Sequence, residues 1–180
     1  MINAKFSSDM LSMLKDVIGQ KFLKYECAKD DVPGSAYGNI RLCFSDGIID
    51  LSNEEFPCPE LDEDITCFSC VLVSDDSPFE PAVVAEIETT MIDSTVLGIE
   101  IVEDEVTINN GGIVINFDSA LILKTDAGDY VFARTVWFSE VILIAHDESY
   151  DTLFPIKKVM ESWENDGENR VSVKRSRKRV

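Results

Sequence analysis

The chain has 180 residues, which suits a single domain with a sizeable core, and its 45% hydrophobic content is ordinary for a globular fold. Its formal net charge is −18 at pH 7, so the chain as a whole weakly repels nucleic acid and anionic membranes. No apolar run is long enough to span a membrane and no opening stretch has the composition of a signal peptide, so the sequence predicts a cytoplasmic protein with no membrane contact.

The first fifty residues predict one helix followed by antiparallel strands. Ser7 is a suitable N-cap for apolar residues at helical spacing, so a helix is expected over residues 8–18. Residues 21–28 alternate between polar and apolar side chains, as a half-buried strand does. An Asp-Gly pair between two alternating runs predicts a hairpin of residues 38–45 and 48–52.

The middle of the chain alternates between loops and strands. Proline, glycine and clustered acids predict loops at residues 30–38, 53–64 and 75–81. Runs rich in β-branched residues predict strands at 65–73, 82–90, 95–102 and 105–108.

The last third predicts a hairpin, a strand and a closing helix. Residues 113–124 are expected to form one long strand that bends near Asp118 and pairs across a turn with residues 130–138. A last strand is expected at 141–145. Apolar residues at helical spacing then predict a helix over residues 152–164.

These elements predict an α+β fold that is predominantly antiparallel β. We expect about eight or nine strands in a single curled sheet, a barrel or a sandwich, flanked by one N-terminal and one C-terminal helix. Residues 1–169 are expected to form one globular β-rich domain, and residues 170–180 a basic C-terminal tail.

Charge is distributed unevenly along the chain. From Leu42 to Leu123 there is no Lys, Arg or His, whereas nineteen residues are Asp or Glu. Without the six basic residues that follow Glu168, ten positive charges face thirty-four negative ones, which leaves −24 on the body. Spread over a folded surface of roughly 8,700 Å², this is one net charge per ~360 Å², about a third of the density on duplex DNA. The acids can therefore imitate or bind a dense charge only if they gather on one face.

The preferred functional hypothesis is a non-enzymatic acidic interaction protein that binds a basic surface of a macromolecular partner. It could be an inhibitor, an immunity-type protein or a mimic of nucleic-acid charge in phage or host defence. A structural or assembly subunit is the first alternative, and a carboxylate-dependent metal enzyme is the second. The acids expected to bind the partner are Glu54, Glu55, Glu60, Asp62, Glu63, Asp64, Asp75, Asp76, Glu80, Glu103, Asp104 and Glu105.

The basic tail has several interpretations. Its cations are Lys174, Arg175, Arg177, Lys178 and Arg179. This composition is typical of a nucleic-acid arm or a localisation signal, but the segment could equally fold back on the acidic body or remain a flexible end. Nucleic acid is expected as a partner only through this tail.

Catalytic, redox and metal motifs are weak in this sequence. Cys67 and Cys70 have CxxC spacing but lie within an apolar strand, where residues three apart point to opposite faces, so we expect reduced core thiols. A hydrolytic triad would have to include His146, the single histidine. His146 directly follows a predicted strand, so we expect it to be a turn residue. The acidic clusters lack the spacing of a calcium loop. We therefore expect no cofactor and no metal site.

Arg134 is the one cation between Lys124 and Lys157. It alternates with Tyr130 and Phe132, so it is expected on the inward face of its strand. A buried guanidinium needs compensation, and we expect a buried carboxylate partner, with anion binding as the alternative.

Overall fold

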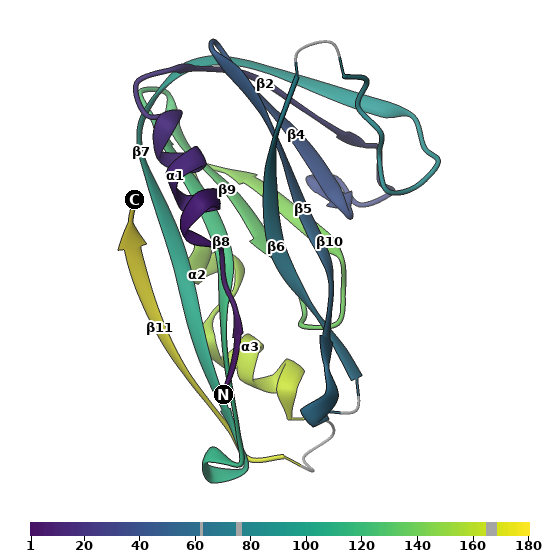
Figure 1. Cartoon of the computed structure of the whole chain (residues 1–180), viewed down its shortest axis with the longest axis vertical. Coiled ribbons are helices and arrows are strands. Elements are labelled where there is room, and N and C mark those ends of the chain that lie inside the picture. The colour runs from purple at the N-terminus through teal and green to yellow at the C-terminus, as the bar shows by residue number, and fades with distance from the viewer. Residues whose placement is uncertain (62, 75–76, 165–168) are drawn as a thin grey trace.

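The computed structural model describes residues 1–61, 63–74, 77–164 and 169–180 (Figure 1). The helices are α1 (Ser8–Asp16), α2 (Tyr150–Leu153) and α3 (Ile156–Trp163), and short 3-10 turns lie at Pro59–Leu61 and Asn109–Gly111. The strands are β1 (Ile2–Ala4), β2 (Lys21–Ala28), β3 (Ser35–Tyr37), β4 (Asn39–Phe44), β5 (Gly47–Cys58), β6 (Glu63–Val73), β7 (Ile87–Ile108), β8 (Ile113–Thr125), β9 (Gly128–Arg134), β10 (Val141–His146) and β11 (Val171–Arg179).

These strands form one sheet in the order β3-β10-β9-β8-β7-β2-β4-β5-β6, with β1 paired to β8 and β11 paired to β7. The predicted predominance of antiparallel β structure is confirmed, and only the pairing of β1 with β8 is parallel within the described residues. The prediction of eight or nine strands is wrong, because the described part of the chain has eleven. β1 and β3 are three residues long, too short to show a periodic pattern. β11 was not predicted because its many Lys and Arg residues are typical of a solvated tail.

The predicted placement of one helix at each end of the sheet is also wrong. α1 does form behind a Ser7 cap, but the strand β1 precedes it. The expected C-terminal helix is divided into α2 and α3 at Pro155, which has no N–H to donate and disfavours helical backbone in Phe154. β11 then follows α3, so neither end of the chain is helical.

β7 replaces three predicted strands with one strand of 22 residues. It pairs with β2 along Ile87–Thr95 and with β8 along Val96–Ile108, so it joins the two halves of the sheet. Figure 1 shows its first half arching over the top of the molecule and its second half running down one side. Asp93 has a φ of 60° beside a register shift, and this bulge lets the strand bend without ending.

Other boundaries differ where polar residues resemble loops. The hairpin of β4 and β5 is confirmed, but β5 continues through Glu54 and Glu55 to Cys58, inside the predicted loop of residues 53–64. β8 is one strand, as predicted, and its register shifts beside Asp118. β9 ends at Arg134, earlier than the expected 138.

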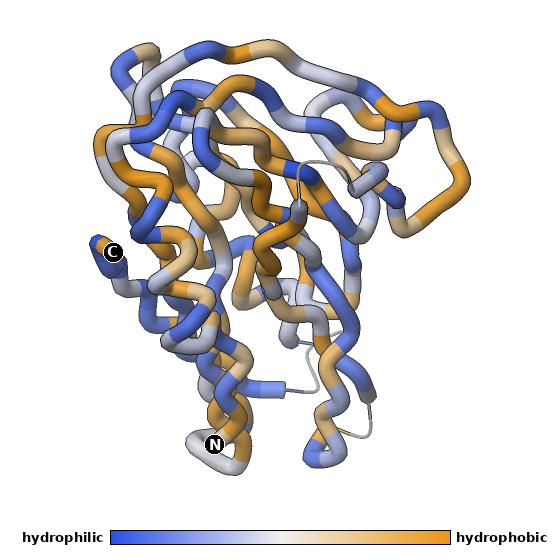
Figure 2. Tube along the Cα trace, turned by 45° about the horizontal axis from the view of Figure 1, so that its top comes forward, coloured by the Kyte–Doolittle hydropathy of each residue, from blue (hydrophilic) through white to orange (hydrophobic). Residues whose placement is uncertain are grey.

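The sheet folds over so that its two halves face each other across the core. The ring of Phe22 on β2 lies 6.4 Å from that of Phe132 on β9, and Arg134 on β9 reaches Asn53 and Thr66 on the opposite layer. Figure 2 shows hydrophobic segments inside and a largely hydrophilic chain near the C-terminus. The ring of Phe6, just before α1, stacks on that of Phe68 on β6. α1 thus covers the open side between the two layers.

Candidate functional site

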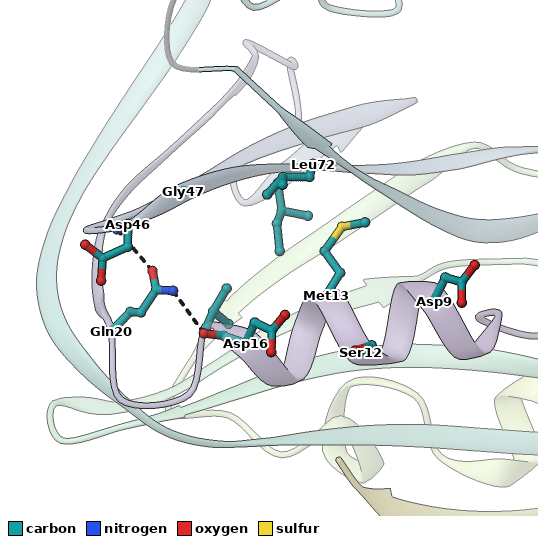
Figure 3. A pocket seen from close by; sticks show the side chains of 10 residues that line it. Asp9, Ser12, Met13, Asp16, Gln20, Asp46, Gly47 and Leu72 are labelled. Carbon is teal, nitrogen blue, oxygen red and sulfur yellow. Dashed lines mark hydrogen bonds between the residues drawn. The ribbon is translucent and has the colours of Figure 1, made fainter.

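An open groove of about 480 Å³ lies between α1, the β4–β5 turn and the end of β6 (Figure 3). Four side chains form its apolar part: Met13 on α1, Val17 directly after α1, Ile49 on β5 and Leu72 on β6. Figure 3 shows the side chains of Met13 and Leu72 pointing toward each other across it. Three carboxylates line the same groove: Asp9, Asp16 and Asp46.

The helical period explains how α1 presents this mixture. Asp9, Met13 and Asp16 are spaced i, i+4 and i+7, so they share one face of the helix, while Leu14 is buried in the core. Seven residues of helix separate the two aspartates by about 10 Å along the axis. The face thus has a negative charge at each end and an apolar side chain between them.

Gln20 fixes the third aspartate beside the helix. Its Nε2 donates to the carbonyl oxygen of Asp16 at 2.9 Å, and its Oε1 accepts from the backbone N–H of Asp46 at 3.1 Å. One side chain therefore bridges the C-terminal end of α1 to the β4–β5 turn. These two hydrogen bonds define this end of the groove.

The groove carboxylates are not neutralised by neighbouring cations. Among the described residues, Asp9, Asp16 and Asp46 form no ion pair. Asp16 is the last residue of α1, where a negative charge opposes the helix dipole.

The acids that the sequence analysis selected do not gather at one place. Glu54, Glu55, Glu60 and Asp64 lie along the end of β5, the turn that joins β5 to β6 and the start of β6. Glu80 follows β6 in a loop that returns to the sheet, where its carbonyl oxygen accepts a hydrogen bond from Asn39 Nδ2 at 2.9 Å. The backbone of Glu63 lies in β6, and Asp62, Asp75 and Asp76 are outside the described residues.

Glu103, Asp104 and Glu105 lie instead on β7, where they bind cations of the same chain. Glu103 pairs with Lys5 at 3.0 Å and Glu105 with Lys174 at 3.2 Å. Asp104 is buried and receives two hydrogen bonds from Arg175, at 2.8 and 2.9 Å. All three carboxylates therefore pair with cations of the same chain.

The predicted basic tail is the edge strand β11, antiparallel to β7 from Val171 to Arg179. Arg175 also donates to Asp151 and to the carbonyl oxygen of Phe154, and Arg177 pairs with Glu100 and Asp151. Of the alternatives left open by the sequence, folding back on the acidic body is the one observed. Lys178 and Arg179 are exposed at the end of the strand.

The prediction that a buried carboxylate pairs with Arg134 is wrong: Arg134 forms no ion pair with any of the described residues. The buried guanidinium donates to Asn53 Oδ1 at 3.3 Å and to Thr66 Oγ1 at 2.8 Å, and it lies over the Phe117 ring at 4.6 Å. Burial lowers the pKa of Arg134 to about 10. Neutral acceptors and an aromatic face therefore compensate this charge in part, while Nη1 is buried with no hydrogen-bond partner among the described residues.

The surroundings of His146 and of the cysteines favour structural roles over catalytic ones. His146 stacks on Tyr130, and its Nε2 lies 3.2 Å from the carbonyl oxygen of Ala127. All five cysteines are free, and burial raises the pKa of the Cys70 thiol to about 12, which disfavours a reactive thiolate. Within the described ranges, no three His, Cys, Asp or Glu residues converge as metal ligands would.

Sequence reasoning missed the groove. The spacing of Asp9, Met13 and Asp16 could have indicated a mixed acidic and apolar helix face, since both aspartates lie in the predicted helix. The approach of Asp46 and Leu72 depends on tertiary packing and has no local signal. The aspartates of α1 also lie outside the block from Leu42 to Leu123 that lacks cations.

No helix in the part of the chain that the structure describes has the length and apolar character needed to cross a membrane. Comparisons of the chain with models of protein families, with curated proteins and with solved structures found no match.

Proposed function

We propose that the protein is a non-enzymatic interaction protein whose groove between α1 and β6 binds a basic segment of a macromolecular partner. The observation that carries this proposal is the contrast between two sets of acids. Those on β7 are bound by cations of the same chain, whereas Asp9, Asp16 and Asp46 surround an apolar groove with no ion pair among the described residues. The groove suits Lys or Arg side chains, whose apolar stems can cover Met13 and Leu72 while their charges reach the carboxylates.

The exposed acids elsewhere assist by attracting the partner from a distance. Glu54, Glu60 and Asp64 are exposed near the β5–β6 turn, and the net charge of −18 favours encounter with a basic surface at low salt. Partners of this kind include a basic enzyme held inactive or a nucleic-acid-binding protein. Five free thiols suit a reducing compartment such as the cytoplasm.

The assembly-subunit hypothesis has less support. A basic tail that reached the acidic body of a neighbouring copy would favour it, but Lys174, Arg175 and Arg177 bind acids of their own chain. The metal-enzyme hypothesis rested on clustered carboxylates, and no specific arrangement among the described residues favours it.

The proposal predicts that charge at the groove matters more than charge in general. We would titrate a ten-residue peptide of five lysines and five leucines against two triple variants that lose the same net charge. The groove variant is Asp9→Asn, Asp16→Asn, Asp46→Asn; the matched control is Glu54→Gln, Glu60→Gln, Asp64→Asn. At 50 mM salt, the groove variant should bind at least about tenfold more weakly than the parent, because three partly screened ion pairs are lost.

The control variant should bind within about threefold of the parent. Raising the salt concentration to 300 mM should weaken binding to the parent and narrow the difference between the variants. Equal affinities of the two triple variants at 50 mM salt would refute a site at the groove.

A further inference from the structure

The strand that borders the groove, β6, is the last strand at its end of the sheet. Thr66 donates its backbone N–H to the carbonyl oxygen of Trp137 instead of to β5. Residues two apart in a strand direct their backbone groups to the same edge, so the N–H and C=O of Leu72 also point away from β5. α1 packs beside the middle of β6 through Phe68 and Cys70, which leaves the C-terminal end of this edge beside the groove.

Within the residues that the structure describes, this end of β6 lacks the usual protection of an edge strand. Ile65–Val73 has no charged residue, and the side chains of Val71 and Leu72 are 51% and 63% exposed. The other long edge strand, β11, is lined with Lys and Arg, which discourage pairing with another chain. An exposed apolar edge in a soluble fold marks a site where a further strand can be added.

The charges around this edge specify the chemistry of the added strand. Alternate residues of an extended segment point to opposite faces, so one set would face α1 and the other would lie beside Val71. The set facing α1 meets Met13 between Asp9 and Asp16, which suits the long stems and positive heads of Lys or Arg. The other set meets an exposed valine, which suits apolar side chains. A groove of about 480 Å³ is of a size to take a few side chains and not a whole helix.

We infer that the groove binds its partner by strand addition: an extended segment with Lys or Arg at alternate positions and apolar residues between them pairs with the edge of β6 at Leu72. This inference rests on the proposed function, since it specifies how the basic segment binds. Backbone pairing supplies affinity, and the alternation of cation and apolar side chain supplies selectivity.

Peptide chemistry tests this mode without disturbing the fold of the protein. The probe is a seven-residue peptide that alternates lysine and leucine, with two N-methylated forms, one methylated on every lysine amide and one on every leucine amide. Only one edge of an added strand pairs with β6. One methylated form should therefore bind at least about tenfold more weakly than the unmodified peptide, and the other within about threefold.

Two variants locate the contact on the protein. Leu72→Ser should weaken binding of the unmodified peptide by about threefold to tenfold, because it removes an apolar contact at the edge. Val84→Ser, at a fully exposed position outside the groove, should leave binding unchanged.

Equal binding of both methylated forms, or a helical circular-dichroism spectrum of the bound peptide, would overturn strand addition. The proposed function would survive that result if the groove triple variant still lost binding. If the unmodified peptide bound the groove triple variant as tightly as the parent, the proposed function would fail together with the inference.

Discussion

At the scale of single residues, the fold disturbs the ionisation of Asp118, at the bend of β8. Its Oδ2 accepts the backbone N–H of Phe6 at 2.6 Å, and its Oδ1 is buried with no hydrogen-bond partner among the described residues. Burial raises the pKa of Asp118 to about 6, against 3.8 for an ordinary aspartate. At neutral pH Asp118 is therefore still mostly ionised, but its burial makes this ionisation more costly in the folded state than in the unfolded chain.

Replacing Asp118 with Asn should stabilise the protein at pH 8 by about 1–3 kcal/mol, because a neutral amide can still accept the N–H of Phe6 without a buried charge. Because the folded-state pKa is raised, the stability contributed by the bound proton is complete below pH 4 and is lost as pH rises through about 6. The parent should thus lose stability relative to Asp118→Asn between pH 4 and 7. Urea unfolding at several pH values measures this, with Asp31→Asn at an exposed position as the control.

Asp9 and Asp16 allow binding to be separated from folding. Asp9 lies in the first turn of α1 and favours the helix dipole, whereas Asp16 ends the helix and opposes it. Asp9→Asn should lower the free energy of unfolding and Asp16→Asn should raise it, each by about 0.3–1 kcal/mol. Both substitutions should weaken binding of the alternating lysine–leucine peptide by about twofold to fivefold. A stability change of the same sign in both variants, or tight binding by either, would contradict these roles.

At the scale of elements, β11 is held to β7 by a cross-strand ladder of opposite charges. Arg175 is the centre of this ladder: its side chain is 6% exposed, and that of Asp104 is fully buried. The guanidinium also lies over the Tyr150 ring at 4.4 Å and binds Asp151, and this bond contributes first to holding the pKa of Asp151 below its usual range. The strand thus ties α2 to the sheet.

Removing one partner of this pair should cost more than removing both. Arg175→Met leaves the buried Asp104 carboxylate without compensation and should lower the free energy of unfolding by about 3–5 kcal/mol. Adding Asp104→Asn to that variant should recover a substantial part of the loss, since no charge then remains buried. Chemical unfolding of both single variants and the double variant forms the cycle, with Lys174→Met as an exposed control on the same strand. A double variant no more stable than Arg175→Met would show that the uncompensated charge of Asp104 is not the source of the loss.

The sequence was sufficient for elements whose signal is local. The β4–β5 hairpin follows from its Asp-Gly turn, and α1 follows from Ser7 and the helical period. It was insufficient where distant residues change the meaning of a local pattern. The acids at 103–105 interrupt the predicted strands, but in the fold they lie within β7 and pair with Lys5, Lys174 and Arg175, which are about seventy or more residues away in the chain. For the same reason the basic C-terminal segment resembled a solvated tail.

The candidate site shows the same limit. The helix face with Asp9, Met13 and Asp16 is encoded in α1, but the opposite wall depends on Asp46 and Leu72, which reach it only through the packing of the sheet. Counting acids along the chain pointed instead to Glu54, Glu60 and Asp64, far from the groove along β5 and β6. The sequence thus indicated the chemistry of a basic partner, and the fold indicates where that partner would bind.

For the whole molecule, a net charge of −18 conceals two populations of acids. One is neutralised inside the fold by β11 and Lys5, and it contributes to stability. The other remains exposed, and at the groove it surrounds an apolar surface beside the edge of β6. Salt should therefore act chiefly on partner binding, because exposed charges are screened far more than buried ones.

The most direct test of the central claim is a map of backbone amide shifts by heteronuclear NMR during titration with the alternating lysine–leucine peptide. The groove account predicts that the largest shifts fall in residues 9–16, 45–47 and 71–73. The largest shifts around Glu54–Glu60 or along β11, with α1 unaffected, would contradict it.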